Sequence, residues 1–391
     1  LPNTFKKLLI LKQQSYYNNE ILIEKRSIMI KLKNTSPAHI IDIPPAQLLV
    51  DLKANLQTAI ELEHSTIPPY LTANFTLFST SGANSEVSKI IGSVLGEEML
   101  HMTIACNVLN AIGGCPVINK PGFIPTYPGN LPGAVDGSLT VGLEKFSLNL
   151  VKNVFMEIEE PENPINIPSD VQSYSEGQTI GEFYNGIITL MTTLEQNAQS
   201  QKPPQTIFTG NPANQVTFPE YYPANVLFPV TDLASATNAI NIIIDQGEGS
   251  STDPFVEPGD SGQGAEPAHY YRFEQIVLGK TLVQQANGSY AFNGPPIPFD
   301  PTQVINMWPN PTMSEFPKGT LAYENCRLFN YNYTSLLNSL HDTFNGQPQN
   351  ISTALGVMFS LRLYAVKLLA QPHPLHPGFM AGPSFEYQPT L

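Results

Sequence analysis

Cysteine is scarce in this sequence, and the three cysteines, Cys106, Cys115 and Cys326, include no Cys-x-x-Cys pair. A sparse, odd set argues against a disulfide framework and against a thiolate zinc site, because both need several cysteines at defined spacings. We therefore expect a reducing, cytoplasmic location.

Basic residues are also few, with 19 Lys and Arg against 33 Asp and Glu and a formal charge of −14. Nucleic acids and anionic membranes repel such a chain at long range, so neither is an expected partner. The sequence also lacks the roughly 20 uninterrupted apolar residues that a membrane-spanning helix needs. A small-molecule substrate is the partner that this composition favours, and assembly into a homo-oligomer stays open.

What the sequence does contain is helical periodicity, with 41% hydrophobic residues for a core. It predicts helices over residues 45–70, 85–112, 146–158, 179–198, 231–245, 267–278, 323–344 and 351–369, the last two as a hairpin. Residues 1–44 are expected to be an N-terminal extension without the pattern of a signal peptide. The loops 201–230 and 247–264 are long enough to suggest lids. The fold class is therefore mainly α, with additional helices and long irregular loops.

The second predicted helix carries Glu98 and His101 three residues apart. Residues at this spacing share a helix face, about 4.5 Å apart along the axis. The face is the apolar one, so a carboxylate buried there needs a cation. This Glu-x-x-His pair is a candidate metal-binding unit.

On the first predicted helix, Glu63 lies on the apolar stripe, whereas Glu61 falls largely on the opposite face. Glu63 is therefore the preferred ligand. Glu61 and His64 also have Glu-x-x-His spacing and are kept as the alternative pair.

A second candidate unit is Glu266 with His269, and Glu182 in the third strong helix supplies a further carboxylate. Two Glu-x-x-His units and one Glu from each of two other helices form the ligand set of di-iron carboxylate four-helix bundles. Glu248, between two glycines, competes with Glu266 for the same role. The predicted metal ligands are thus Glu63, Glu98, His101, Glu182, Glu266 and His269.

The donor types favour particular metals. Carboxylates can bridge two cations, and imidazole suits iron, manganese or zinc while leaving positions open for dioxygen. Two iron ions are the preferred cofactors, with manganese or zinc as alternatives. Zinc is less favoured because its structural sites usually contain thiolate.

Several segments together are characteristic: ELEHSTIPPYL (61–71), EEMLH (97–101), NAIGGCP (110–116), TIGEFY (179–184), QGEG (246–249), HYYRF (269–273) and AGPSFE (381–386). They resemble the ferritin-like domain of the iminophenyl-pyruvate dimer synthase family, which includes the large enzymes of the violacein and rebeccamycin pathways. The resemblance spans about residues 45–387 and implies a ferritin-like four-helix bundle. We therefore expect residues 45–391 to form one ferritin-like domain with lid loops and a C-terminal helical hairpin. The resemblance also implies a metal-dependent oxidative step on a small aromatic or amino-acid-derived molecule.

We therefore expect a di-metal oxidoreductase, and a non-enzymatic metal-binding or ligand-storage protein is the alternative. Tyr70, Tyr184, Tyr270 and Arg272 are candidates for the substrate pocket, with Arg272 holding a carboxylate or pairing with an acidic residue. No catalytic residue beyond the metal ligands is identified. His373 and His376 resemble a metal clip, but their Pro-rich surroundings favour a solvated segment.

Overall fold

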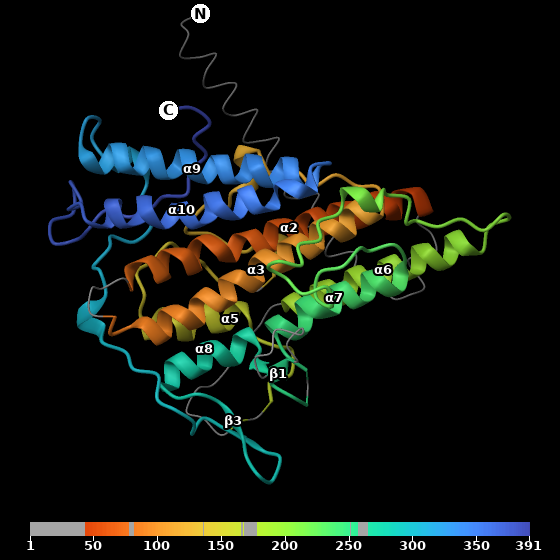
Figure 1. The fold of residues 1–391 in the computed structure, drawn as a ribbon, viewed down its shortest axis with the longest axis horizontal. Helices are drawn as coiled ribbons and strands as arrows, with labels where there is room; N and C mark the ends of the chain where they lie inside the picture. Colours follow the sequence, from red (N-terminus) through yellow and green to blue (C-terminus); the bar gives the residue numbers. More distant parts are fainter. Residues whose placement is uncertain are drawn as a thin grey trace, which may run out of the picture.

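The computed structural model describes residues 44–77, 82–135, 137–165, 167, 178–250, 252–256 and 265–391. Its centre is an antiparallel pair of long helices, α2 (Pro45–Thr76) and α3 (Ser85–Ala111), which cross the middle of the molecule (Figure 1). The predicted extension, except for Pro44, lies outside the described residues.

Two further groups of helices flank this pair. On one side are α6 (Ile180–Gln199), α7 (Leu233–Gly247) and α8 (His269–Leu278). On the other side, α9 (Leu321–Phe344) and α10 (Ile351–Leu369) form the predicted hairpin (Figure 1). A mainly helical architecture of this kind confirms the predicted fold class.

The remaining elements are short. A composite helical segment comprises α4 (Leu148–Leu150), a π-helical turn (Val151–Phe155) and α5 (Met156–Ile158). Strand β1 (Phe255–Val256) pairs with β2 (Glu266–Pro267), and β3 (Val283–Gln284) pairs with β4 (Tyr290–Ala291), both antiparallel. Single 3-10 turns occupy Pro121–Phe123, Pro132–Ala134, Pro212–Asn214, Pro301–Gln303, Met313–Glu315 and Pro348–Asn350.

Helix α2 continues past Pro68 and Pro69 to Thr76, beyond the predicted end at residue 70. Proline has no N–H, so Pro69 cannot donate to the Ser65 carbonyl one turn earlier. The hydroxyl of Tyr127 donates to that carbonyl instead, at 2.8 Å. This replacement satisfies a backbone group that the proline leaves without its helical partner.

The first of the two predicted lid loops is fastened to α3. The side-chain amide of Asn107 pairs with both backbone polar groups of Val216, each at 2.8 Å, and Tyr222 donates to the Gly96 carbonyl at 2.8 Å. Residues 201–230 therefore form a packed cover over this part of the bundle.

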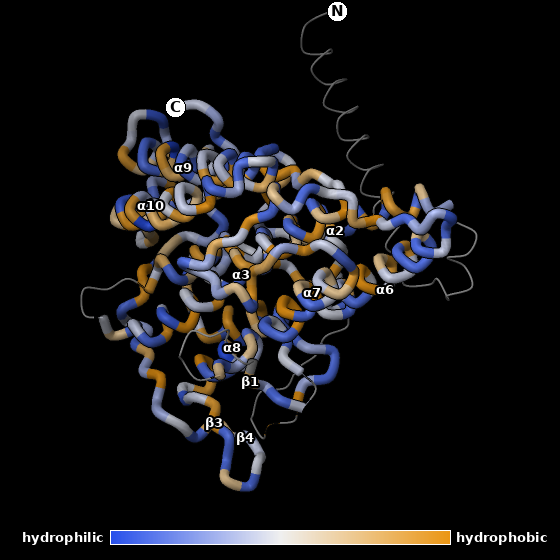
Figure 2. Tube along the Cα trace, turned by 45° about the vertical axis from the view of Figure 1, so that its right-hand side comes forward, coloured by the Kyte–Doolittle hydropathy of each residue, from blue (hydrophilic) through white to orange (hydrophobic). Residues whose placement is uncertain are grey.

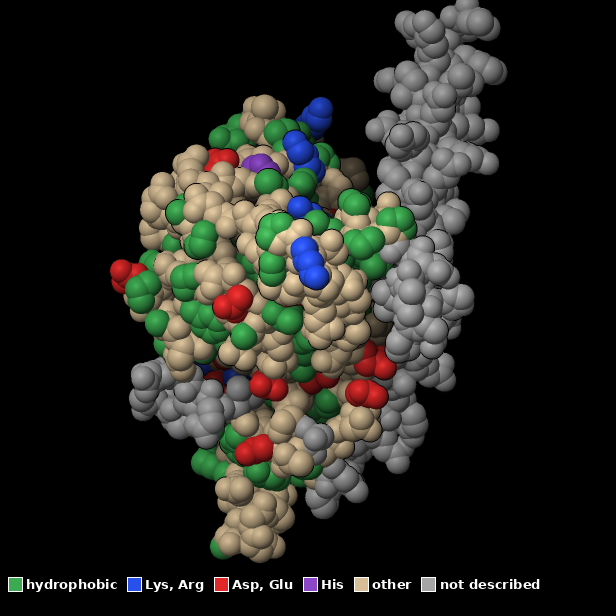
Figure 3. Space-filling model, turned by 90° about the vertical axis from the view of Figure 1, so that its right-hand side faces the viewer, with side chains coloured by type: hydrophobic (Ala, Val, Ile, Leu, Met, Phe, Trp, Pro, Cys, Tyr) green, Lys and Arg blue, Asp and Glu red, His purple; other side chains and the backbone are tan. Residues whose placement is uncertain are grey.

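The surface agrees with the acidic composition. Lys and Arg side chains are few on the face shown in Figure 3, and acidic groups are spread over its lower part. Pro348–Leu369 is long and apolar enough to cross a membrane by length and composition, which is weak evidence because core helices pass the same test. Apolar segments along α10 are visible in Figure 2.

Candidate metal centre

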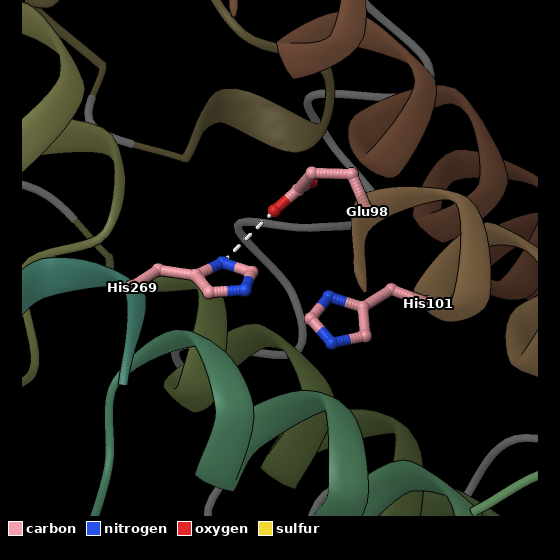
Figure 4. Close-up of side chains that lie close together, drawn as sticks. All are labelled: Glu98, His101 and His269. Carbon is pink, nitrogen blue, oxygen red and sulfur yellow. Dashed lines mark ion pairs between the residues drawn. The ribbon is translucent and has the colours of Figure 1, made fainter. Parts of the chain in front are cut away.

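Three side chains meet at the centre of the bundle: Glu98 and His101 from α3 and His269 from the first position of α8 (Figure 4). Each offers one ligand atom, and these atoms lie within 4.8 Å of one another. Their relative exposures are 2%, 2% and 0%. The predicted proximity of these three residues is thus present in the structure.

His101 is held between two partners. Its Nε2 lies 2.9 Å from Oε1 of Gln246, near the end of α7, and its Nδ1 lies 3.5 Å from Oε2 of Glu63 on α2. Because an amide oxygen only accepts hydrogen bonds, Gln246 favours a proton on Nε2. The Nδ1 lone pair then faces Glu63 and the interior of the cluster.

His269 has the same arrangement with a carboxylate as its outer partner. Its Nε2 lies 2.8 Å from Oε2 of Glu97, and Arg272 contacts that carboxylate through Nη2 at 3.0 Å. Its Nδ1 lies 3.0 Å from Oε1 of Glu98 and 3.4 Å from Oε2 of Glu159. An imidazole fixed by an outer carboxylate is the usual support for a metal-binding histidine.

Each of the three inner carboxylates has one oxygen fixed by a hydroxyl group and the other facing a histidine. Tyr184 donates to Glu63 at 2.5 Å, Thr66 donates to Glu98 at 2.6 Å, and Tyr70 donates to Glu159 at 2.6 Å. The hydroxyls come from α2 and α6, and the carboxylates come from α2, from α3 and from the residue that follows α5. The hydroxyls orient the carboxylates without neutralising them.

The charges of this cluster call for a cation. Glu63, Glu98 and Glu159 are buried, and in the described part of the chain their ion-pair contacts are with histidines rather than with Lys or Arg. Nδ1 of His269 is buried and lacks a partner with hydrogen-bond geometry. Buried carboxylates need paired positive charge, and oxygen and imidazole donors suit divalent transition metals. The residues present therefore fit a metal centre.

Burial and the neighbouring charges shift the pKa values of the groups in this cluster. Burial and the neighbouring Glu159 raise the pKa of Glu98 to about 7, although His269 opposes this. Burial disfavours the charged form of His269, yet Glu159, Glu97 and Glu98 together raise its pKa well above the usual value. Burial also acts against ionised Glu97, but Arg272 and His269 lower its pKa to about 2. The raised pKa values of Glu98 and His269 favour bound protons among these carboxylates.

Two predicted ligands lie elsewhere. Glu182 forms the capping box of α6, where its Oε2 accepts from the Thr179 N–H and its own N–H donates to the Thr179 hydroxyl, both at 3.1 Å. The prediction that it joins the other ligands is wrong in this structure. The Thr-x-x-Glu sequence is itself a capping-box pattern, and it accounts for this carboxylate locally.

Glu266 is also outside the cluster, which corrects the second Glu-x-x-His unit. It lies in β2, its side chain is 45% exposed, and it contacts Arg272 at 3.3 Å. Helix α8 begins only at His269, so the three-residue spacing does not place Glu266 on the same helical face. Pro267, the residue after Glu266, also belongs to strand β2.

The alternative ligands have other partners in the structure. His64 faces α9, where its Nε2 lies 2.6 Å from the Tyr333 hydroxyl, and burial lowers its pKa to about 3. Glu61 accepts from Gln57 at 3.3 Å. Glu248 accepts from the Gly181 N–H at 2.6 Å, at the start of α6. The preference for Glu63 over the Glu61–His64 pair therefore agrees with the geometry.

The candidate substrate residues have other contacts. Tyr70 and Tyr184 are buried and hold the carboxylates of Glu159 and Glu63. Arg272 pairs with Glu97 and Glu266 and donates to the Pro267 carbonyl at 2.6 Å. Tyr270 is buried with its ring against Tyr271. Tyr70 and Tyr184 thus contact carboxylates of the cluster, and Arg272 contacts Glu97, the outer partner of His269.

Sequence reasoning assigned no place in the site to Glu159 and Gln246, and it considered Glu97 only as a substitute for Glu98. Glu159 follows α5 directly, after a π-helical turn, and such turns are frequent at functional sites. The signal for it was an acidic run, Glu157, Glu159 and Glu160, at the end of an apolar helix. Gln246 lies in the QGEG segment and Glu97 in the EEMLH segment, but neither pattern indicates contact with a histidine.

Comparisons with known proteins agree with this architecture. A family model described as Ferritin-like matches residues 56–278, which contain the residues of the cluster. Dichlorochromopyrrolate synthase from Lentzea aerocolonigenes is 26% identical over 401 residues, covering 90% of this chain but 37% of that protein. The chain thus spans well under half the length of this relative.

The fold is also found in a solved structure, a ferritin-like protein from Caulobacter vibrioides. It superposes with a TM-score of 0.51 at 21% identity, covering 81% of this chain and 95% of the other. At this identity the similarity concerns the fold. The predicted resemblance to ferritin-like domains of the rebeccamycin-pathway type is confirmed, and the chain belongs to the ferritin-like family.

Proposed function

We propose that the protein is a di-iron oxidoreductase that acts on a small aromatic or amino-acid-derived molecule. The observation that carries the proposal is the buried set of three carboxylates facing Nδ1 of His101 and Nδ1 of His269. A pair of metal ions bound there would supply redox chemistry towards dioxygen, and iron suits this donor set.

The residues divide into two halves around Glu98. Glu63 and His101 would hold one ion, and Glu159 and His269 the other, with Glu98 within reach of both histidines. The hydroxyls of Tyr184, Thr66 and Tyr70 hold the carboxylates in place. Gln246 and Glu97 fix the two imidazoles so that each presents Nδ1 inward.

The surroundings favour an aromatic, water-poor site. Tyr70 lies edge-on to Phe155 and Phe273, with ring centroids 4.6 Å and 5.3 Å away. Exclusion of water strengthens the electrostatic interactions between the cluster and a bound molecule. The named synthase among the relatives supports an organic substrate, although this chain spans only 37% of that protein.

The reaction class is a two-electron oxidation, in which two hydrogen atoms leave the organic molecule and dioxygen is reduced to hydrogen peroxide. The test loads metal-free protein with Fe²⁺ anaerobically and records oxygen uptake after addition of air-saturated buffer. Indole-3-pyruvate with ammonium, which forms an aromatic imine in solution, serves as the probe substrate, and Glu98→Ala is the control.

We expect probe-dependent oxygen consumption that continues beyond the amount of iron added, together with a product two hydrogen atoms lighter than the imine from which it forms. A single burst that matches the iron and does not depend on the probe would favour iron storage. No uptake by iron-loaded protein would contradict the oxidoreductase proposal.

A further inference from the structure

A second group of metal-ligating side chains lies at the ends of the α9–α10 hairpin. Glu315 belongs to the 3-10 turn before α9, and His373 and His376 follow α10. One ligand atom from each lies within 4.8 Å of the others. None of the three belongs to the centre described above, and the solvated arrangement expected for the two histidines is wrong for His373, which is 3% exposed.

His373 has an unsatisfied polar atom at this point. Its Nδ1 accepts from the Leu375 N–H at 3.2 Å, whereas its buried Nε2 has no hydrogen-bond partner among the residues that the structure describes. A buried polar atom without a partner costs free energy, and a cation would satisfy it. If Nε2 bound a metal ion, the ring proton would move to Nδ1. Nδ1 could then no longer accept the hydrogen bond from the Leu375 N–H.

The other two ligands are already oriented. Glu315 accepts the Thr312 N–H through Oε2 at 2.7 Å, and its Oε1 lies 3.6 Å from Nε2 of His376. The ring of His376 is stacked on Trp308, with centroids 3.4 Å apart and planes 8° from parallel. These contacts fix one carboxylate oxygen and one imidazole beside His373.

Backbone hydrogen bonds fix the segment that carries the histidines. The N–H of His373 donates to the Phe379 carbonyl at 2.9 Å, and the N–H of Ala381 donates to the Gln371 carbonyl at 2.8 Å. The Trp308 N–H donates to the Met380 carbonyl at 3.0 Å. The segment is thus a closed loop attached to the neighbouring segment at Trp308, which preorganises its side chains.

We propose that Glu315, His373 and His376 form a second metal site, which takes a single divalent cation of the Zn²⁺ type. Two imidazoles and one carboxylate suit such an ion, and the partial exposure of Glu315 and His376 leaves room for water as a fourth ligand. Bound metal would join the segment entering α9 to the segment leaving α10, so the site stabilises the hairpin and is independent of the oxidative centre.

The chain offers its own reporter for this site. Trp308 is the single tryptophan of the sequence, and it stacks on one proposed ligand. Full-length protein is first freed of metal with a chelator. Ni²⁺, a paramagnetic quencher, is then titrated while Trp308 emission is recorded, and Zn²⁺ is added as a competitor.

The variants separate ligation from packing. His376→Phe keeps an aromatic ring against Trp308 but removes the ligand. Glu315→Gln removes the charge while its amide oxygen can still accept from Thr312. His341→Asn, which changes a histidine on α9 outside the cluster, is the matched control, and circular dichroism checks that all variants are folded.

We expect saturable quenching in the wild type and in His341→Asn, with recovery of emission on addition of Zn²⁺. His376→Phe and Glu315→Gln should each weaken the response at least about tenfold, the lower end of the loss seen when support of a metal ligand is removed. Non-saturable quenching, or equal quenching in these two variants and the wild type, would overturn the proposal. Quenching from the buried centre would survive both substitutions, so the two sites are distinguishable.

Discussion

Nε2 of His269 lies 2.8 Å from the carboxylate of Glu97, while Nδ1 of the same ring lies 3.0 Å from the carboxylate of Glu98. Two successive residues of α3 thus contact opposite sides of one imidazole. Glu97 is tied to Arg272 and acts from outside, whereas Glu98 faces the cluster. This division of roles gives the first prediction.

Glu97→Gln should weaken metal binding without removing a ligand. The amide oxygen can still accept from Nε2 of His269, but the ion pair with Arg272 is lost and the imidazole becomes a poorer donor. We expect a loss of about 10- to 100-fold in metal affinity, measured by competition with a chelator. Unchanged affinity would show that Glu97 serves only to pair Arg272.

The carboxylates differ in their expected effect on metal content. Glu98→Ala should lose the metal, because it removes the carboxylate near both histidines. Glu182→Ala should keep it and lose roughly 1 kcal/mol of folding stability through the capping box. Elemental analysis and thermal unfolding of both variants check this. Loss of metal from Glu182→Ala together with retention of metal by Glu98→Ala would contradict the assignment of Glu98 as a ligand and of Glu182 as a helix cap.

Stability of the metal-free protein should depend on the ionisation of Glu98. The pKa of Glu98 is 4.5 in the unfolded chain and is raised to about 7 in the folded protein. Its contribution to the free energy of unfolding is therefore fully present below about pH 4.5 and is lost as the pH rises through 7. His269, whose pKa is also raised, acts in the same direction. We expect Glu98→Gln to flatten the fall in unfolding midpoint between pH 6 and pH 8. A fall of equal size in the variant would exclude Glu98 as its source.

Much of the bundle could be predicted because its signals are local. The helix pairs, their glycine stops and the C-terminal hairpin follow from periodicity and end signals along single segments. Glu98 and His101 could be paired because both lie within one helix. Glu63 followed from the apolar stripe of α2.

The ligands that could not be predicted depend on where a helix begins or bends. Glu266 and His269 have helical spacing in the sequence, but α8 starts at His269 and the β1–β2 pairing fixes Glu266 as strand. Glu159 follows a helical segment that contains a π-helical turn, and a 3.6-residue period does not predict such a turn. Glu182 fits two patterns equally, a ligand and a cap, and tertiary structure alone decides between them.

The continuation of α2 through its two prolines gives a stability prediction. Tyr127→Phe removes the donor to the Ser65 carbonyl, which Pro69 cannot supply, and should cost about 1–3 kcal/mol. In a Pro69→Ala background the new N–H at position 69 can donate to that carbonyl, so the same substitution should cost less. Urea unfolding of the four proteins forms a double-mutant cycle. Equal costs in both backgrounds would refute the compensation.

The most direct test of the account is the position of bound iron. Crystals of metal-free protein would be soaked anaerobically with Fe²⁺, and an anomalous difference map recorded at the iron edge. We expect two peaks inside the cluster, one beside Glu63 and His101 and one beside Glu159 and His269, with Glu98 contacting both. A map without density there, or with iron bound by Glu182 or Glu266 instead, would contradict it.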